Sequence, residues 1–198
     1  MTTDIHQHLA ALEARLDRLE SIEAIRQIIT AYAIACDEHD MPRLMNLFTQ
    51  DAEFDAPNGS MVAQGKSAIE DMFINTFRIR GPAYHWTHDT TISVSPDNPD
   101  EATGLVLSHA ETTPNGVVSI AAMRYQDNYR RETDGQWRFS KRIITFLYYV
   151  PAADFADGLN QTNRVSIGGA LIGADYPEKL PVWNEFIDAH GPLELGGS

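Results

Sequence analysis

The sequence predicts an α+β fold in which helices pack on an antiparallel sheet. Helical periodicity dominates residues 4–77, whereas strand patterns joined by tight turns dominate residues 102–149. The last of these strand patterns is apolar on both faces, so both faces need cover from helices, a cavity or a partner subunit. Helices followed by a three-stranded meander are typical of the α+β class.

Composition and charge narrow the class of partner. The chain has 198 residues, enough for one domain with an appendage, and its net charge is −13 from 28 acids and 15 bases. Such a surface repels phosphate backbones and anionic lipid, so we expect no nucleic-acid or membrane partner. Cys36 is the only cysteine, which excludes an intrachain disulfide. With no secretion signal and no long apolar stretch, a soluble cytoplasmic protein is expected.

Residues 4–39 are predicted to form a helix. Its first part carries a narrow apolar stripe that would pack either on a neighbouring subunit or on the body: Ile5, Leu9, Leu12, Leu16 and Leu19. Ser21 is a weak restart signal, where the helix would bend or break. Tyr32 lies on the continuing stripe. Asp37 lies at its margin near the C-terminal end, where the helix dipole disfavours a carboxylate unless it has a partner.

The following elements are shorter. Asp40 is expected to cap a helix with Pro42 in its first turn, ending near Phe48. Two short strands and a third helix are then predicted at 51–56, 61–64 and 65–77.

The meander comprises residues 102–112, 117–131 and 136–149, with hairpin signals at Asn115-Gly116 and Asp134-Gly135. The chain changes character after Pro151. Residues 154–175 are rich in small residues with no strong period, and 178–189 is a candidate helix.

The run Tyr84-His85-Trp86-Thr87-His88-Asp89 precedes a predicted strand at 89–95. Strict alternation places His88 on the same face as Ile92 and Val94, toward the apolar side. A histidine aimed into a core is either a proton carrier or, more often, a structural residue satisfied by one hydrogen bond.

Motifs for nucleotide, metal-protease or serine-hydrolase chemistry are absent from the sequence. His85 and His88 lie three residues apart, but no third candidate ligand lies at a spacing typical of a metal site. We therefore predict neither a metal nor a cofactor.

The order of elements, together with Tyr32, Asp37, His88 and Arg142, resembles the SnoaL-like branch of the nuclear transport factor 2 superfamily over residues 22–149. The resemblance is greatest to the group that holds hexachlorocyclohexane dehydrochlorinase, scytalone dehydratase and bile acid 7α-dehydratase. It implies a cone, a curved antiparallel sheet with N-terminal helices enclosing a pocket. The expected organisation is an N-terminal helical extension (1–21), the cone domain (22–150) and a C-terminal extension over the body or a partner subunit (151–198).

The resemblance also implies roles for individual residues. Asp37 is similar to the catalytic Asp of that group, and His88 to the catalytic His paired with it. Arg142, in the segment Phe139-Ser140-Lys141-Arg142, is similar to their pocket-facing Arg, and Tyr32 to the tyrosine of the dehydratases. Substrate contacts are expected from five further residues, with Phe54 lying in an Asp-Ala-Glu-aromatic strand similar to theirs: His85, His109, Phe54, Trp86 and Phe146.

These residue types suit proton transfer at carbon. A neutral imidazole takes the proton, a buried carboxylate fixes its tautomer, and an Arg or Tyr stabilises the developing charge. The predicted function is a cofactor-independent lyase of dehydratase type on a hydrophobic aromatic, polyketide or terpenoid-like molecule, in a homo-oligomer (dimer or trimer). The alternatives are an isomerase or cyclase on the same scaffold, or a non-catalytic binding module.

Simpler structural interpretations of the same residues stay open. Tyr32 would then be a core residue, and Asp37 would pair with Arg26 or Arg43. Arg142 would be a surface cation of the sheet.

Overall fold

A computed structural model describes residues 2–191, with side chains from residue 5 onward. The helices are α1 (Thr2–Glu38), α2 (Met41–Asn46), α3 (Lys66–Ile79), the 3-10 turn η1 (Ala152–Asp154), α4 (Phe155–Gly158) and α5 (Pro181–His190). The strands are β1 (Phe48–Asp55), β2 (Ala63–Gln64), β3 (Tyr84–Val94), β4 (Glu101–Thr112), β5 (Ser119–Arg131), β6 (Trp137–Pro151), β7 (Asn163–Ile167) and β8 (Ala170–Gly173).

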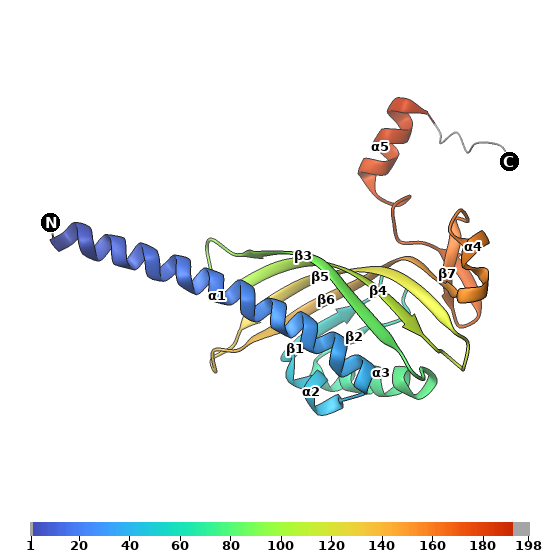
Figure 1. The fold of residues 1–198 in the computed structure, drawn as a ribbon, viewed down its shortest axis with the longest axis horizontal. Coiled ribbons are helices and arrows are strands. Elements are labelled where there is room, and N and C mark those ends of the chain that lie inside the picture. Colours follow the sequence, from blue (N-terminus) through green and yellow to red (C-terminus); the bar gives the residue numbers. More distant parts are fainter. Residues whose placement is uncertain (1, 192–198) are drawn as a thin grey trace.

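The strands form one curved sheet in the order β2-β1-β6-β5-β4-β3 (Figure 1). β1 runs parallel to β6, and the other neighbours in this order are antiparallel. The sheet stays open, with β2 and β3 at its edges, and the N-terminal helices lie against one face. The expected α+β class with a curved antiparallel sheet and N-terminal helices is confirmed.

The meander turns form as their sequences require. Asn115 and Gly116 have φ of 51° and 79°, and Gly135 has φ of 77°. Two successive positive φ values suit a type I′ hairpin, which Asn-Gly adopts with little strain. Asp40 caps α2 as predicted, because its carboxylate accepts a hydrogen bond from the Arg43 amide at 3.0 Å.

The core lies between the concave face of the sheet and the helices. α1 packs on β3 and β6, and α3 packs on β1. Aromatic rings meet edge-to-face or tilted where these elements converge, at centroid distances of 5.4–6.5 Å: Tyr32, Phe48, Phe54, Phe73 and Phe139. This cluster holds the helical layer on the strands that carry the candidate site.

α1 continues through Ser21 without the expected break. The Ser21 hydroxyl donates to the Asp17 carbonyl at 2.7 Å, so the serine is accommodated inside the helix. The N-terminal part of α1 extends past the sheet (Figure 1). Neither α1 nor any other described helix is apolar enough, over a sufficient length, to cross a bilayer.

β3 contains one extra residue relative to its neighbour. Thr87 pairs with Ser108 and Thr90 with Val106, so three steps along β3 match two steps along β4. A bulge of this kind reverses which side chains face the core. His85 and Thr87 therefore share the concave face with Ile92 and Val94, whereas simple alternation placed His88 there.

The C-terminal segment is more regular than its composition suggested. β7 and β8 form a hairpin, and β7 pairs with the end of β6. Buried Arg164 fixes the segment by donating to the Leu147 carbonyl at 2.7 Å and to both carboxylate oxygens of Glu178 at 2.8 Å. Phe155 packs on Tyr148 and Val150, so this segment covers part of the second face of β6.

Phe73 tests the aromatic core. Phe73→Ala should lower the free energy of unfolding by about 3–5 kcal/mol, because the side chain is buried among four aromatic rings and leaves a cavity. Urea denaturation followed by circular dichroism measures this loss. The neighbouring Ile74→Ala, at a side chain 38% exposed, should cost below about 1 kcal/mol. Equal losses would contradict the packing.

Candidate active site

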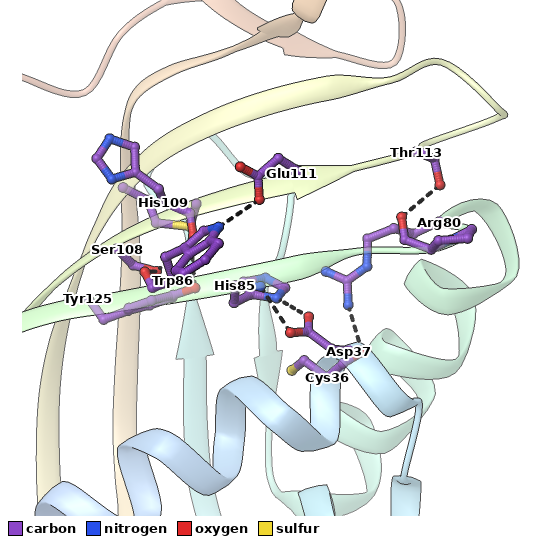
Figure 2. A network of polar contacts seen from close by, with 12 residues as sticks. Cys36, Asp37, Arg80, His85, Trp86, Ser108, His109, Glu111, Thr113 and Tyr125 are labelled. Carbon is purple, nitrogen blue, oxygen red and sulfur yellow. Dashed lines mark hydrogen bonds and ion pairs between the residues drawn. The ribbon is translucent and has the colours of Figure 1, made fainter.

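Asp37 and His85 form the central pair of the site. The His85 ring Nδ1 lies 2.5 Å from Asp37 Oδ1, and the His85 backbone amide donates to Oδ2 at 2.9 Å. Because a carboxylate only accepts, Nδ1 carries a proton, and in the neutral ring Nε2 is then the nitrogen with the free lone pair. Both side chains are mostly buried, and Figure 2 shows them pointing toward each other. The carboxylate at the unfavourable end of α1 thus has its partner.

The predicted contact between Asp37 and His88 does not form. His88 Nε2 instead lies 2.7 Å from His109 Nδ1, on the opposite face of the sheet. Trp86 is also on that face, half exposed, where its indole donates to Glu111 at 2.8 Å (Figure 2). The bulge in β3 is the cause, because it turns His85 inward and His88 outward.

Arg142 is fully buried and paired with Asp127. Its Nε and Nη2 donate to the two carboxylate oxygens at 2.8 and 2.7 Å. Burial lowers the pKa of the guanidinium, but the charge and hydrogen bonds of Asp127 outweigh it and raise the pKa above its usual value. Nη1 is buried and has no hydrogen-bond partner among the described residues. Arg142 is therefore a permanent cation with one donor group still free, not a surface cation.

Three aromatic rings surround that guanidinium. Its carbon lies 4.0 Å from the ring centre of Tyr32, 4.1 Å from Phe139 and 4.3 Å from Tyr125. Burial raises the pKa of the Tyr32 phenol well above its ordinary value. The phenol therefore keeps its proton at neutral pH and is suited to donating a hydrogen bond.

A narrow cleft joins these groups. It lies between α1 and the concave face of the sheet and is too narrow to hold a water molecule as it stands. Its walls come from five elements: Ile29, Tyr32 and Ala33 of α1, His85 and Thr87 of β3, Ser108 of β4, Tyr125 of β5 and Arg142 of β6. The cleft is mostly apolar, with an imidazole and a guanidinium on its walls.

The end of α1 is held in place by Arg80. Its Nη2 donates to the Cys36 carbonyl at 3.2 Å, one residue before Asp37, and the guanidinium lies over the Phe77 ring. Burial raises the pKa of the Cys36 thiol to about 11, so this cysteine is no nucleophile at neutral pH.

The structure separates the predicted site residues into two groups. Tyr32, His85 and Arg142 line the cleft, and Asp37 lies directly behind His85. The other five lie elsewhere: His88, His109 and Trp86 around a second hollow on the outer face, Phe54 in the aromatic core, and Phe146 stacked on Tyr149.

Sequence reasoning missed Asp127, the partner of Arg142. A signal was present, because Asp127 shares a strand face with Tyr125 and Tyr129, and an acid on an apolar face needs a cation. Thr87, Ser108 and Tyr125 gave no such signal. In residues 2–191, His, Cys, Asp and Glu side chains make no group of three with metal-binding geometry.

The family model of the SnoaL-like domain matches residues 17–143. The chain belongs to the SnoaL-like family. The matched range holds all the residues that line the cleft, as well as Asp37 and Asp127.

Individual SnoaL-like relatives match over most of their length. The γ-hexachlorocyclohexane dehydrochlorinase of Sphingobium indicum is 29% identical over 143 residues, covering 70% of this chain and 88% of the relative. The crystal structure of LinA aligns with a TM-score of 0.63 at 26% identity, covering 71% and 95% of the two chains. A scytalone dehydratase-like protein of Novosphingobium aromaticivorans aligns with a TM-score of 0.62 at 22% identity, covering 78% and 97%. At that identity the last likeness concerns the fold.

Removing the charge of Asp127 should destabilise the protein strongly. Asp127→Asn leaves the Arg142 guanidinium buried without its counter-ion, so we expect a loss of about 3–5 kcal/mol in the free energy of unfolding. Glu53→Gln removes an exposed pair with Lys141 and should cost only about 0–1 kcal/mol. Urea denaturation compares the two variants. Similar losses would show that the Arg142 pair is solvated.

Alkylation measures the burial of Cys36. With its pKa at about 11, the thiol holds roughly 10²–10³-fold less thiolate at neutral pH than an ordinary cysteine, and burial also blocks access. Iodoacetamide should therefore modify the native protein far more slowly than the protein unfolded in guanidinium chloride, as followed by mass spectrometry. Comparable rates would show that the end of α1 opens readily.

Proposed function

We propose that this protein is a cofactor-independent lyase that eliminates a leaving group from a hydrophobic small molecule, with His85 as the base. The observation that carries this proposal is the Asp37–His85 pair on one side of a cleft whose other side holds Arg142. The dehydrochlorinase of Sphingobium indicum supports the reaction class, as an enzyme whose name states an elimination.

The proton path begins at His85. With Nδ1–H bonded to Asp37, Nε2 is the basic atom left to the cleft, and it takes a proton from substrate carbon. The electrons of that C–H bond form the new double bond as the leaving group departs from the adjacent carbon. Asp37 stabilises the imidazolium that results, without itself taking the proton. Solvent, or a leaving hydroxide, removes the proton and restores the base.

The leaving group gathers negative charge, and Arg142 supplies the matching cation. Its Nη1 is buried and unpaired among the described residues. This nitrogen can therefore donate to a halide or an oxygen without breaking an existing hydrogen bond. Tyr32 assists as a hydrogen-bond donor, since its raised pKa disfavours proton transfer. His88 has no part in this path, being on the outer face.

The cleft walls favour an apolar substrate with one polar leaving group. An aromatic, polyketide or terpenoid-like ring matches this lining. As it stands the cleft has no room for a water molecule, so a ring-sized substrate has to move the walls apart on entry.

A matched pair of histidine variants tests the base. His85→Gln should lower kcat by about 10²–10⁴-fold because the proton acceptor is lost. His88→Gln, the same substitution three residues away on the other face, should leave kcat within about threefold of the parent. Chloride release from hexachlorocyclohexane and water loss from scytalone are the assays, with circular dichroism checking that both variants fold. A large loss in His88→Gln alone would reject the assignment.

Product analysis separates the reaction classes. Mass spectrometry of an elimination shows a product lighter by the elements of HCl or water. A product of unchanged mass with a shifted double bond would make the protein an isomerase. Binding of these compounds without conversion by any amount of enzyme would favour the non-catalytic module.

A further inference from the structure

The N-terminal part of α1 carries a row of large apolar side chains with no cover. Ile5, Leu9, Leu12, Leu16 and Leu19 are each between 50% and 65% exposed. Figure 1 shows this part of the helix extending past the sheet. Most of this segment lies before the range matched by the model of the SnoaL-like domain, which begins at residue 17. The body of the protein therefore leaves this apolar stripe uncovered.

The spacing of the stripe is that of a coiled-coil seam. The five residues recur at intervals of four, three, four and three, an average period of 3.5 that is maintained over two heptads. In heptad notation Leu9 and Leu16 occupy a, and Ile5, Leu12 and Leu19 occupy d. A helix that packs on a globular body shows a broader stripe with period 3.6. A narrow a/d seam is what two helices bury against each other.

We propose that residues 5–20 form a parallel coiled coil with the same segment of a second copy of this chain. The flanking charges specify this partner and direction. In a parallel pair, each g residue meets the e residue of the following heptad on the partner. Arg15 at g then faces Glu20 at e, and His8 faces Glu13. In an antiparallel pair g meets g, so Arg15 would meet His8 or Arg15 instead, and the attraction to Glu20 is lost.

The body prepares this helix for association. Arg131 donates to both oxygens of Asp17 at 2.6 and 3.2 Å and also binds Asp100, and Ser21, one turn further along the helix, is buried. These contacts fix the direction in which the segment leaves the sheet. The folded part of α1 also nucleates the helix, which removes the largest obstacle to pairing of a short segment. Two heptads can then be enough, because each helix is already anchored at its C-terminal end.

Cysteine cross-linking tests the pairing and its direction together. Leu12→Cys places a thiol at a d position facing its counterpart, whereas Ala14→Cys places one on the outward side of the same turn. The native Cys36 is buried and does not compete. On mild oxidation, Leu12→Cys should form disulfide-linked dimers on the order of tenfold faster than Ala14→Cys. Non-reducing gels measure both rates.

Equal rates for the two thiols would overturn the proposal, even if the bodies associate by another surface. Faster linking between mixed Leu9→Cys and Leu12→Cys proteins than within either one would also overturn it, because a and d meet in antiparallel pairs. None of these positions touches the cleft, so turnover should be unchanged in all variants.

A charge exchange provides an independent test of the parallel register. Arg15→Glu should weaken self-association on the order of tenfold, since it sets two acids against each other at both e/g contacts. Combining it with Glu20→Arg restores an opposite-sign pair and should recover the parent dissociation constant in sedimentation equilibrium. A double variant as weak as Arg15→Glu would overturn the register.

Discussion

The buried Arg142–Asp127 ion pair is the constraint around which the inside of the cone is arranged. A guanidinium with no exposed surface requires a counter-ion, and Asp127 supplies it from the neighbouring strand with two short hydrogen bonds. Tyr32, Tyr125 and Phe139 then pack their faces against the cation. Two of these rings also form walls of the cleft. The same pair therefore positions the aromatic lining and leaves one Arg142 donor group unpaired beside it.

The second constraint is the bulge in β3, which assigns the histidines to opposite faces. Inside, His85 meets Asp37 at the end of α1, and outside, His88 meets His109. Opposite faces of β3 thus hold two histidines with different partners, a carboxylate on the inside and a second imidazole on the outside. The inner imidazole is bonded to a carboxylate in an apolar cleft, which is the arrangement that proton abstraction needs.

Much of this architecture could be predicted from the local periodicity of the sequence. The helical stripe placed Tyr32 inside and Asp37 at its margin, and the Asn-Gly and Asp-Gly turns located the meander. The resemblance to known enzymes placed Arg142 in the pocket. The choice between His85 and His88 was not predictable, because Thr87, His88, Asp89, Thr90 and Thr91 are all polar. Such a run shows no apolar alternation, so an inserted residue leaves no trace in the pattern.

The two apolar faces of the sheet also explain why the chain has segments that cover the sheet both before and after its long strands. Helices α1 and α3 cover the concave face and enclose the cleft, while the segment from η1 to β8 covers part of the other face of β6. α1 contributes to both proposals, the elimination and the self-association. Its C-terminal half carries Tyr32 and Asp37, and its N-terminal half carries the open seam.

The protonation state of the two His85 ring nitrogens can be observed by nitrogen NMR. In ¹⁵N-labelled protein, with the His85 resonance assigned by its loss in His85→Gln, the neutral ring should be protonated at Nδ1 and unprotonated at Nε2, because Asp37 only accepts. Asp37→Asn should abolish this preference. A ring protonated at Nε2 in the parent protein, or one that is indifferent to Asp37, would contradict the account.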